Sequence, residues 1–180
     1  MKYIIALTVI IFSLLSVGCG FHARTNASFP AELKRFYFSS ERPYTVLSIQ
    51  LKQLLKSMGA VRVKKPSEAK FTILITRDHF AYNRPDVVNS TLPTAMNYSQ
   101  TVKISIIENL NHTMIASQLF TTSQSLTLNA GQIYTINENN LIKSELNRNL
   151  ISLIYYWILS YKTRDVLHHA SIMQSTQRAS

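Results

Sequence analysis

The sequence predicts an α/β protein, a two-layer sandwich in which two helices pack on one face of a mixed four-stranded sheet. Three observations predict it. Apolar residues recur at three- and four-residue spacing in residues 47–58 and again in residues 141–157, which is typical of amphipathic helices. Between them, residues 98–106 alternate apolar and polar side chains, as a half-buried strand does. The resulting order, βαβ and then ββα, favours helices layered on one sheet.

The first strand and the first helix follow from a short aromatic run and from the residues that flank the helix. KRFYFSS, which ends at Ser40, favours a strand because aromatic residues fit a pleated surface. The helix over residues 47–58 has Pro43 at its entrance and Gly59 just past its end, which are the positions that these residue types prefer.

Further strands are predicted by alternation and by short apolar runs. Residues 60–65 alternate and predict a strand or its beginning, and residues 71–76 are a second short apolar run. Residues 77–96 lack periodicity and contain two prolines, so they are interpreted as a loop or mobile hairpin end. After residues 98–106 comes the polar turn ENLNHT, and residues 114–128 return as the antiparallel neighbour.

The last helix is predicted over residues 130–160, where an apolar stripe runs opposite Lys143, Glu145 and Arg148. Residues 161–180 are polar and are expected to form a flexible tail. One domain over residues 29–160 is therefore expected.

The N-terminus has the composition of a secretory signal. Lys2 precedes fifteen uncharged, mostly apolar residues, 3–17, and then the small residue Gly18. The run is shorter than the about 20 residues of a membrane-spanning helix, and it lacks the periodicity of a buried core helix. Residues 1–18 are therefore interpreted as a signal peptide.

Cys19 is the only cysteine of the chain and directly follows this signal. In an exported protein an intermolecular disulfide or inert burial would be the ordinary explanations. Its position instead resembles a bacterial lipobox, although Ser16 stands where Leu is preferred and Leu15 is one position further back. Lipidation of Cys19 leaves no thiol unexplained, and Gly20 after it suggests sorting to the outer membrane. Residues 19–28 would then form a lipidated N-terminus and linker.

The chain is strongly basic, with a formal net charge of +10, which implies an anionic partner. Export argues against nucleic acid as that partner. Between residues 52 and 70 six basic residues face one acid, Glu68: Lys52, Lys56, Arg62, Lys64, Lys65 and Lys70. Lys52 and Lys56 share a helix face at i, i+4 spacing. Arg77 and Arg84 lie at or past the end of a strand, where a long loop can present them to a ligand.

No residue pattern indicates catalysis, a metal or a cofactor other than a covalent lipid on Cys19. The four glycines of the chain form no phosphate-binding loop and no nucleophile elbow. Asp78 and His79 are the only acid–histidine neighbours, and adjacent residues of a strand point to opposite faces. A hydrolase that uses these two residues is the minor alternative, and the chain is expected not to be an enzyme.

With these elements placed, the chain resembles the LptE family of lipopolysaccharide-assembly outer-membrane lipoproteins. The resemblance spans nearly the whole chain after residue 18. The residues that carry it are Cys19-Gly20-Phe21-His22 with Arg24, Ser39-Ser40, Pro43-Tyr44, Leu47, Leu51, Leu54, Gly59-Ala60-Val61, Tyr98 and Glu145-Leu146.

The resemblance implies an accessory protein, anchored by lipid on the periplasmic side of the outer membrane. It implies two partners: the lipopolysaccharide-transport β-barrel, which the protein plugs and helps to assemble, and lipopolysaccharide itself. Lipopolysaccharide phosphates are expected to contact some of six basic residues: Arg62, Lys64, Lys65, Arg77, Arg84 and Lys143. The alternative is a generic envelope scaffold lipoprotein that binds other outer-membrane proteins without contacting lipopolysaccharide.

Overall fold

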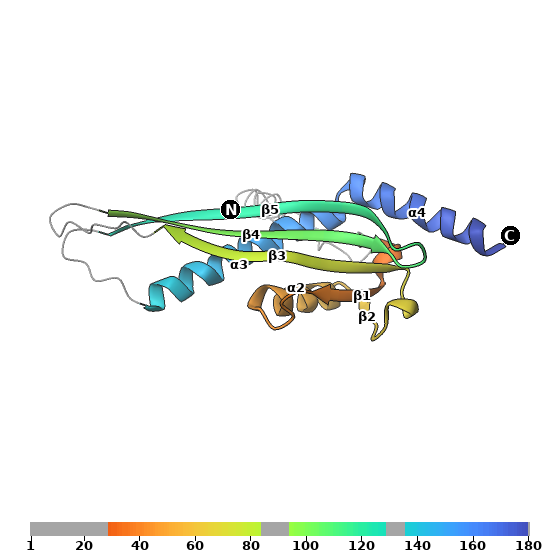
Figure 1. Ribbon diagram of the computed structural model, residues 1–180, viewed down its shortest axis with the longest axis horizontal. Helices are drawn as coiled ribbons and strands as arrows, with labels where there is room; N and C mark the ends of the chain where they lie inside the picture. Colours follow the sequence, from red (N-terminus) through yellow and green to blue (C-terminus); the bar gives the residue numbers. More distant parts are fainter. Residues whose placement is uncertain (1–28, 84–93, 129–135, 180) are drawn as a thin grey trace, which may run out of the picture.

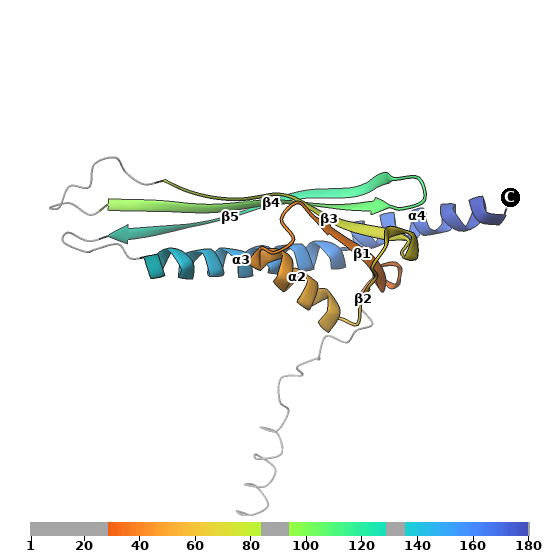
Figure 2. The ribbon, with the colours of Figure 1, turned by 60° about the horizontal axis from the view of Figure 1, so that its bottom comes forward.

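Five strands form one mixed sheet, and helices cover one of its two faces (Figures 1 and 2). The computed structural model describes residues 29–83, 94–128 and 136–179. The strands are β1 (Arg35–Ser40), β2 (Val61–Arg62), β3 (Phe71–Asn83), β4 (Thr94–Glu108) and β5 (Thr113–Leu128). The helices are α2 (Val46–Ser57), α3 (Ile136–Leu159) and α4 (Tyr161–Ala179), with short 3₁₀ turns η2 (Ala31–Leu33) and η3 (Pro66–Glu68).

The strand order is β2-β1-β3-β4-β5. β1 is parallel to both β2 and β3, whereas β4 is antiparallel to both of its neighbours, β3 and β5. The predicted α/β class is confirmed, but the prediction of four strands and two helices was wrong, because the described residues form five strands and three α-helices. β2 has two residues and is separated from β3 by η3, so the two apolar runs on either side of η3 are distinct strands.

The core lies between the sheet and the helices. The alternation in β4 is confirmed: Tyr98, Val102 and Ile104 all point into the core and are fully buried. The spacing in α2 is confirmed as well, with Leu47 and Leu51 fully buried against the sheet. Each such side chain contributes about 1.5–3 kcal/mol through removal of apolar surface from water, so these faces hold the two layers together.

The segment over residues 77–96 was interpreted as a loop or mobile hairpin end, and this interpretation was wrong for residues 77–83 and 94–96, which are strand. β3 continues to Asn83 and β4 begins at Thr94. Residues 84–93 lie outside the described part of the chain. The extended strands β3 and β4, together with β5 at the sheet edge, form a long three-stranded arm (Figure 1).

A bulge in β3 explains why this segment shows no periodicity. The pairing with β4 shifts between Thr76 and His79, and Arg77 within the shift has a positive φ of 53°. Before the bulge, odd-numbered residues such as Ile75 face the helices, and after it the even-numbered Phe80 does. Because the side-chain alternation changes phase, a pattern read across residues 77–79 looks irregular.

A second apolar cluster forms beyond the bulge. The ring centroids of Phe80 and Tyr98 lie 6.2 Å apart, and those of Tyr82 and Tyr98 lie 6.1 Å apart. Ile142 and Leu146 of α3 pack against the same cluster from the helical layer. This packing joins the arm of β3 and β4 to α3.

The C-terminal segment is a helix where a flexible tail was predicted. α3 ends at Leu159, and Ser160 begins the next helix because its Oγ accepts a hydrogen bond from the backbone N–H of Thr163 at 3.2 Å. In α4, Leu167 is fully buried in the main core. Among residues 161–176, whose burial is described, the other buried residues of α4 are Thr163 and Gln174, so this inner face is mostly polar and gives no amphipathic signal in the sequence.

Candidate functional site

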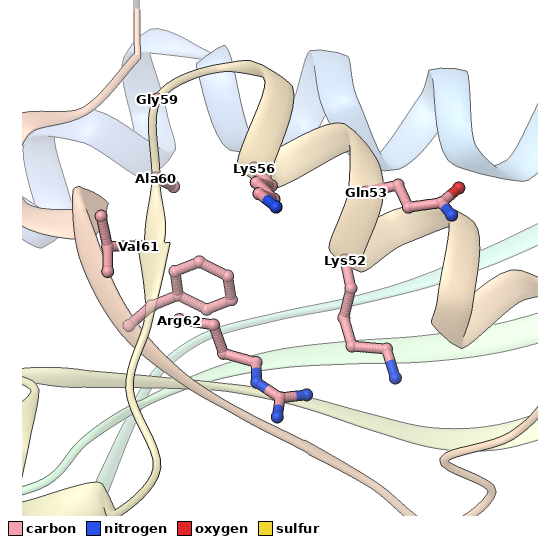
Figure 3. A pocket seen from close by; sticks show the side chains of 8 residues that line it. Lys52, Gln53, Lys56, Gly59, Ala60, Val61 and Arg62 are labelled. Carbon is pink, nitrogen blue, oxygen red and sulfur yellow. The ribbon is translucent and has the colours of Figure 1, made fainter.

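A basic pocket of about 600 Å³ lies between the C-terminal half of α2 and β2. Figure 3 shows Lys52 and Lys56 from α2 and Arg62 from β2 around the same hollow. Val61 of β2 supplies apolar surface beside these cations, and the buried Phe36 of β1 lies beneath them. We call this hollow the α2–β2 pocket.

The two ends of α2 position the lysines of the α2–β2 pocket. At the start of the helix, the Thr45 hydroxyl accepts a hydrogen bond from the Ser48 backbone N–H at 3.3 Å, so Thr45, and not Pro43, caps the helix. Lys52 and Lys56 follow at i, i+4 spacing and therefore lie one above the other on one face of the helix.

The turn after α2 brings Arg62 to the same place. The N–H of Ala60 bonds to the carbonyl of Leu55 at 3.1 Å, and the N–H of Gly59 bonds to that of Lys56 at 3.0 Å. This pair of bonds reverses the chain at a left-handed Gly59, as the sequence predicts. β2 then pairs with β1, which places Arg62 opposite Phe36.

No carboxylate of the described residues lines the α2–β2 pocket. The Lys52 Nζ donates a hydrogen bond to the Pro43 carbonyl at 3.3 Å and lies 5.5 Å from the centre of the Phe38 ring. The Asp165 carboxylate lies 3.5 Å from His169 Nε2 on α4 and so is placed on another element. The charge of the pocket is therefore not neutralised by neighbouring acids.

A second, smaller pocket of about 220 Å³ lies beside the bulge of β3, where α2 begins and α3 passes. Arg42 and Lys143 bring positive charge to it, and the Lys143 Nζ lies 5.3 Å from the centre of the Phe80 ring. Arg42 donates a hydrogen bond to the Asp78 carbonyl at 3.3 Å. The Arg77 backbone N–H donates to the Glu41 carboxylate at 3.2 Å, which joins the bulge to the segment before α2.

The structure divides the predicted lipopolysaccharide-binding residues into two groups. Arg62, Lys64 and Lys65 lie on β2 and in the turn after it, and all three are exposed. Arg77 lies in the bulge of β3, and Lys143 lies on α3 beside the second pocket. Arg84 and Cys19 lie outside the described residues.

Two of the three cations of the α2–β2 pocket were not among the predicted site residues. Lys52 and Lys56 belong to the basic run seen in the sequence, and their i, i+4 spacing was the signal that could have selected them. Arg42, at the second pocket, has no basic residue at i, i+4 spacing in the sequence and therefore gives no comparable signal.

The structure separates Asp78 from His79. The Asp78 carboxylate accepts a hydrogen bond from Gln100 Nε2 at 3.1 Å, on the helix-covered side of the sheet. His79 is exposed and pairs in register with Thr101, whose side chain lies on the open face. These two side chains form no acid–base pair.

Two further features of the described residues concern metals and membranes. No group of three or more His, Cys, Asp or Glu side chains in residues 29–83, 94–128 and 136–179 is arranged to hold a metal ion. None of the helices described has a stretch that is both long and apolar enough to cross a bilayer.

The fold defines a class first, that of small α/β domains with helices on one face of a mixed sheet. The solution structure of an uncharacterized lipoprotein B from Nitrosomonas europaea has the same fold. The TM-score is 0.63 at 16% identity, and the match covers 84% of this chain and 97% of that one. A crystal structure of a minor lipoprotein from Acinetobacter baumannii matches with a TM-score of 0.49 at 20% identity, over 76% of this chain and 92% of that one.

The sequence comparison then points to a particular kind of lipoprotein. The chain is 30% identical over 88 residues to the LPS-assembly lipoprotein LptE of Photorhabdus laumondii. The match covers 42% of this chain and 48% of that protein, so the chain spans about half the length of the curated relative it matches. No sequence model of a protein family matches the chain. The resemblance to LptE-like lipoproteins that the sequence indicates is confirmed by this relative.

Proposed function

We propose that this chain is an outer-membrane lipoprotein that plugs and helps to assemble the lipopolysaccharide-transport β-barrel, and that binds lipopolysaccharide on its way to the outer leaflet. The observation that carries the proposal is the similarity to an LPS-assembly lipoprotein, at 30% identity over 88 residues. The fold shared with a solved lipoprotein supports it. Cys19, directly after the apolar N-terminal run, supplies the lipid anchor.

The open face of the sheet supports the barrel as a partner. Across β4 and β5, the hydroxyl groups of Thr101 and Thr121 pair at 3.0 Å on this face, and the exposed Ser117 pairs at 3.0 Å with the buried Ser105. Lys103 is the one charged residue among the outward-facing positions described on these two strands. A polar surface with little charge can enter a water-filled barrel lumen without burying unpaired ions.

The cations beside the bulge support lipopolysaccharide as a ligand. Arg42, Arg77 and Lys143 lie near one another in the fold, and Arg84 follows β3 in the sequence. Arginine forks match phosphate geometry, and lysine adds a point charge. We therefore assign the phosphates of lipopolysaccharide to this group.

Affinity isolation of the tagged chain from membranes, followed by mass spectrometry of proteins and lipids, tests the proposal. We expect one large β-barrel protein together with lipopolysaccharide. Recovery of several smaller envelope proteins without lipopolysaccharide would instead support the scaffold alternative. Recovery of the barrel without lipopolysaccharide would contradict the proposed lipopolysaccharide binding but not the barrel partner.

Charge reversal at the bulge should weaken lipopolysaccharide binding. Replacing Arg77 and Arg84 by Glu removes two phosphate partners and adds repulsion, so affinity should fall, most strongly at low ionic strength. The matched control reverses Arg148 and Lys162, two exposed cations elsewhere on the helical layer, and should bind nearly as well as the unsubstituted chain. Equal affinity of both variants at low salt would contradict this site.

The anchor has its own test. Cys19→Ser removes the thiol that accepts the lipid, so metabolic labelling with a fatty acid should no longer mark the chain. Stable anchoring takes more than one acyl chain, and the variant would carry none. It should therefore also leave the membrane fraction or remain unprocessed. Ser16→Leu, which restores the preferred lipobox residue, should be labelled at least as strongly as the unsubstituted chain. Unchanged labelling of Cys19→Ser would rule out this anchor.

A further inference from the structure

The net charge of the chain is concentrated in one part of the domain. Residues 29–70 carry nine Lys or Arg against three Glu, whereas residues 71–180 carry eight against six Asp or Glu. The basic part includes α2 and β2, the two elements that enclose the α2–β2 pocket. Most of the net positive charge of these residues therefore lies in the part of the domain that contains the α2–β2 pocket.

The chain enters the domain at this same edge. Phe29 and Leu33 are buried in the main core, which fixes the start of the described chain. Directly after them, the carbonyl of Lys34 accepts a hydrogen bond from the N–H of Val61 at 2.7 Å, and Arg35 pairs in register with Val61. The entry point is thus bonded to the strand that lines the α2–β2 pocket (Figure 2).

Chain length then limits how far the pocket can lie from the anchor. Cys19 precedes Phe29 by ten residues, and ten residues span at most about 35 Å when fully extended. With an acylated Cys19, the tether lets the α2–β2 pocket reach the lipid headgroups, where its charges act over a screening length of about 8 Å at physiological salt.

The pocket has the chemistry of an anionic lipid headgroup. Three cations without an acidic neighbour among the described residues surround it, and they suit a phosphate. Val61, which is 60% exposed, offers apolar surface beside them, which suits the glycerol and the first methylenes of the acyl chains. The volume of about 600 Å³ admits a headgroup but is open to the outside rather than a closed cavity.

We propose that the α2–β2 pocket binds the phosphate headgroup of an anionic phospholipid in the leaflet that holds the acylated Cys19. The inference rests on the lipid anchor of the proposed function, but not on the barrel or on lipopolysaccharide. The pocket orients the tethered domain on the membrane, with β2 facing the headgroups and the arm of β3, β4 and β5 pointing away from the pocket.

Photo-crosslinking in defined vesicles tests this site. The full, acylated chain carries a benzoyl-phenylalanine in place of Val61 and is reconstituted into phosphatidylethanolamine vesicles with or without phosphatidylglycerol. Mass spectrometry identifies the lipid attached after irradiation. The test variant replaces the three pocket cations: Lys52→Gln, Lys56→Gln and Arg62→Gln. The matched control removes three cations elsewhere: Lys103→Gln, Arg148→Gln and Lys162→Gln.

We expect phosphatidylglycerol adducts that fall by about tenfold or more in the test variant and persist in the control, since each basic residue near an anionic surface adds to the attraction. Equal yields of the phosphatidylglycerol adduct in the test and control variants would overturn the proposal. Adducts with phosphatidylethanolamine in the same yield as with phosphatidylglycerol would also overturn it. Circular dichroism of all variants shows whether a loss reflects misfolding, and a misfolded triple variant is replaced by Arg62→Gln alone.

A third vesicle composition separates the two lipid sources. When lipopolysaccharide is added to vesicles that contain phosphatidylglycerol, the phospholipid adduct should persist. An adduct with lipopolysaccharide in its place would overturn the assignment and move the lipopolysaccharide phosphates to this pocket. Fatty-acid labelling in the same preparation distinguishes failure of the anchor from failure of the pocket. A chain that carries the fatty-acid label but forms no phospholipid adduct would contradict only the proposed binding in the pocket.

Discussion

Gly59 ends α2 in a backbone conformation that few residues adopt without strain. Its φ is +84°, and its N–H and that of Ala60 bond back to the last turn of the helix. The turn matters for the site because it directs the chain into β2, where Arg62 joins Lys56 at the same pocket. The turn at Gly59 therefore determines that Arg62 lies beside Lys56 at the α2–β2 pocket.

Gly59→Ala should lower the free energy of unfolding by about 1–2 kcal/mol. A Cβ at this position meets no atom within 4 Å, so the cost comes from the left-handed backbone and not from a clash. Gly59→Asn is the matched control and should lose less, because Asn tolerates this conformation. Urea denaturation followed by circular dichroism measures both variants. Equal stability of Gly59→Ala and the unsubstituted chain would contradict the argument.

At the scale of elements, α4 shows how a polar segment becomes part of the core. Ser160 caps it, and Leu167 inserts into the core that the sheet, α2 and α3 share. Thr163, one turn before Leu167, is buried as well, although its hydroxyl interacts with Ser160. The helix is held by one apolar anchor and by local hydrogen bonds rather than by an apolar stripe.

Leu167→Ala should lower the free energy of unfolding by about 2–5 kcal/mol, because it removes a fully buried side chain and leaves a cavity. Met173→Ala on the same helix is the control. Met173 is 69% exposed, so its truncation should change stability by less than about 0.5 kcal/mol. Thermal or urea unfolding measures the difference between the two. A flexible tail, in contrast, would make both substitutions equally harmless.

At the scale of the whole molecule, charge and polarity are distributed over different surfaces. The edge beside β2 is basic, whereas the open face of β4 and β5 consists mainly of Ser, Thr and Asn. Charged residues are 16% of the chain, below the about 25% of an average globular protein. The molecule therefore offers one surface to an anionic partner and another to a polar, weakly charged one.

Photo-crosslinkers at different surfaces should capture different partners. A probe at Thr101 on the open face, or at Asn111 in the turn between β4 and β5, should capture one large membrane protein in high yield. The same probe at Lys64, beside β2, should capture lipid in preference to protein. Gel shifts and mass spectrometry of the adducts provide the measurement. Crosslinks from Thr101 to many small partners would favour a scaffold protein.

The candidate site could be predicted from the sequence only in part. Lys52 and Lys56 are related by helical spacing, which a sequence shows directly. Arg62 joins them because β2 pairs in parallel with β1, and a sequence does not show that pairing. The grouping of Lys143 with Arg42, about a hundred residues apart, depends in the same way on how α3 crosses the sheet.

The sequence by itself determined the elements whose signals are local. The apolar spacing of α2, its end at Gly59 and the antiparallel pairing of β4 with β5 all follow from neighbouring residues, since helix periodicity, strand alternation and a short turn act over a few positions. Only the tertiary structure decided the rest. The bulge in β3 reverses the phase of alternation at Arg77, and the docking of α4 depends on a site for Leu167 that distant elements build. These features arise from contacts between segments far apart in the chain, where burial outweighs local preference.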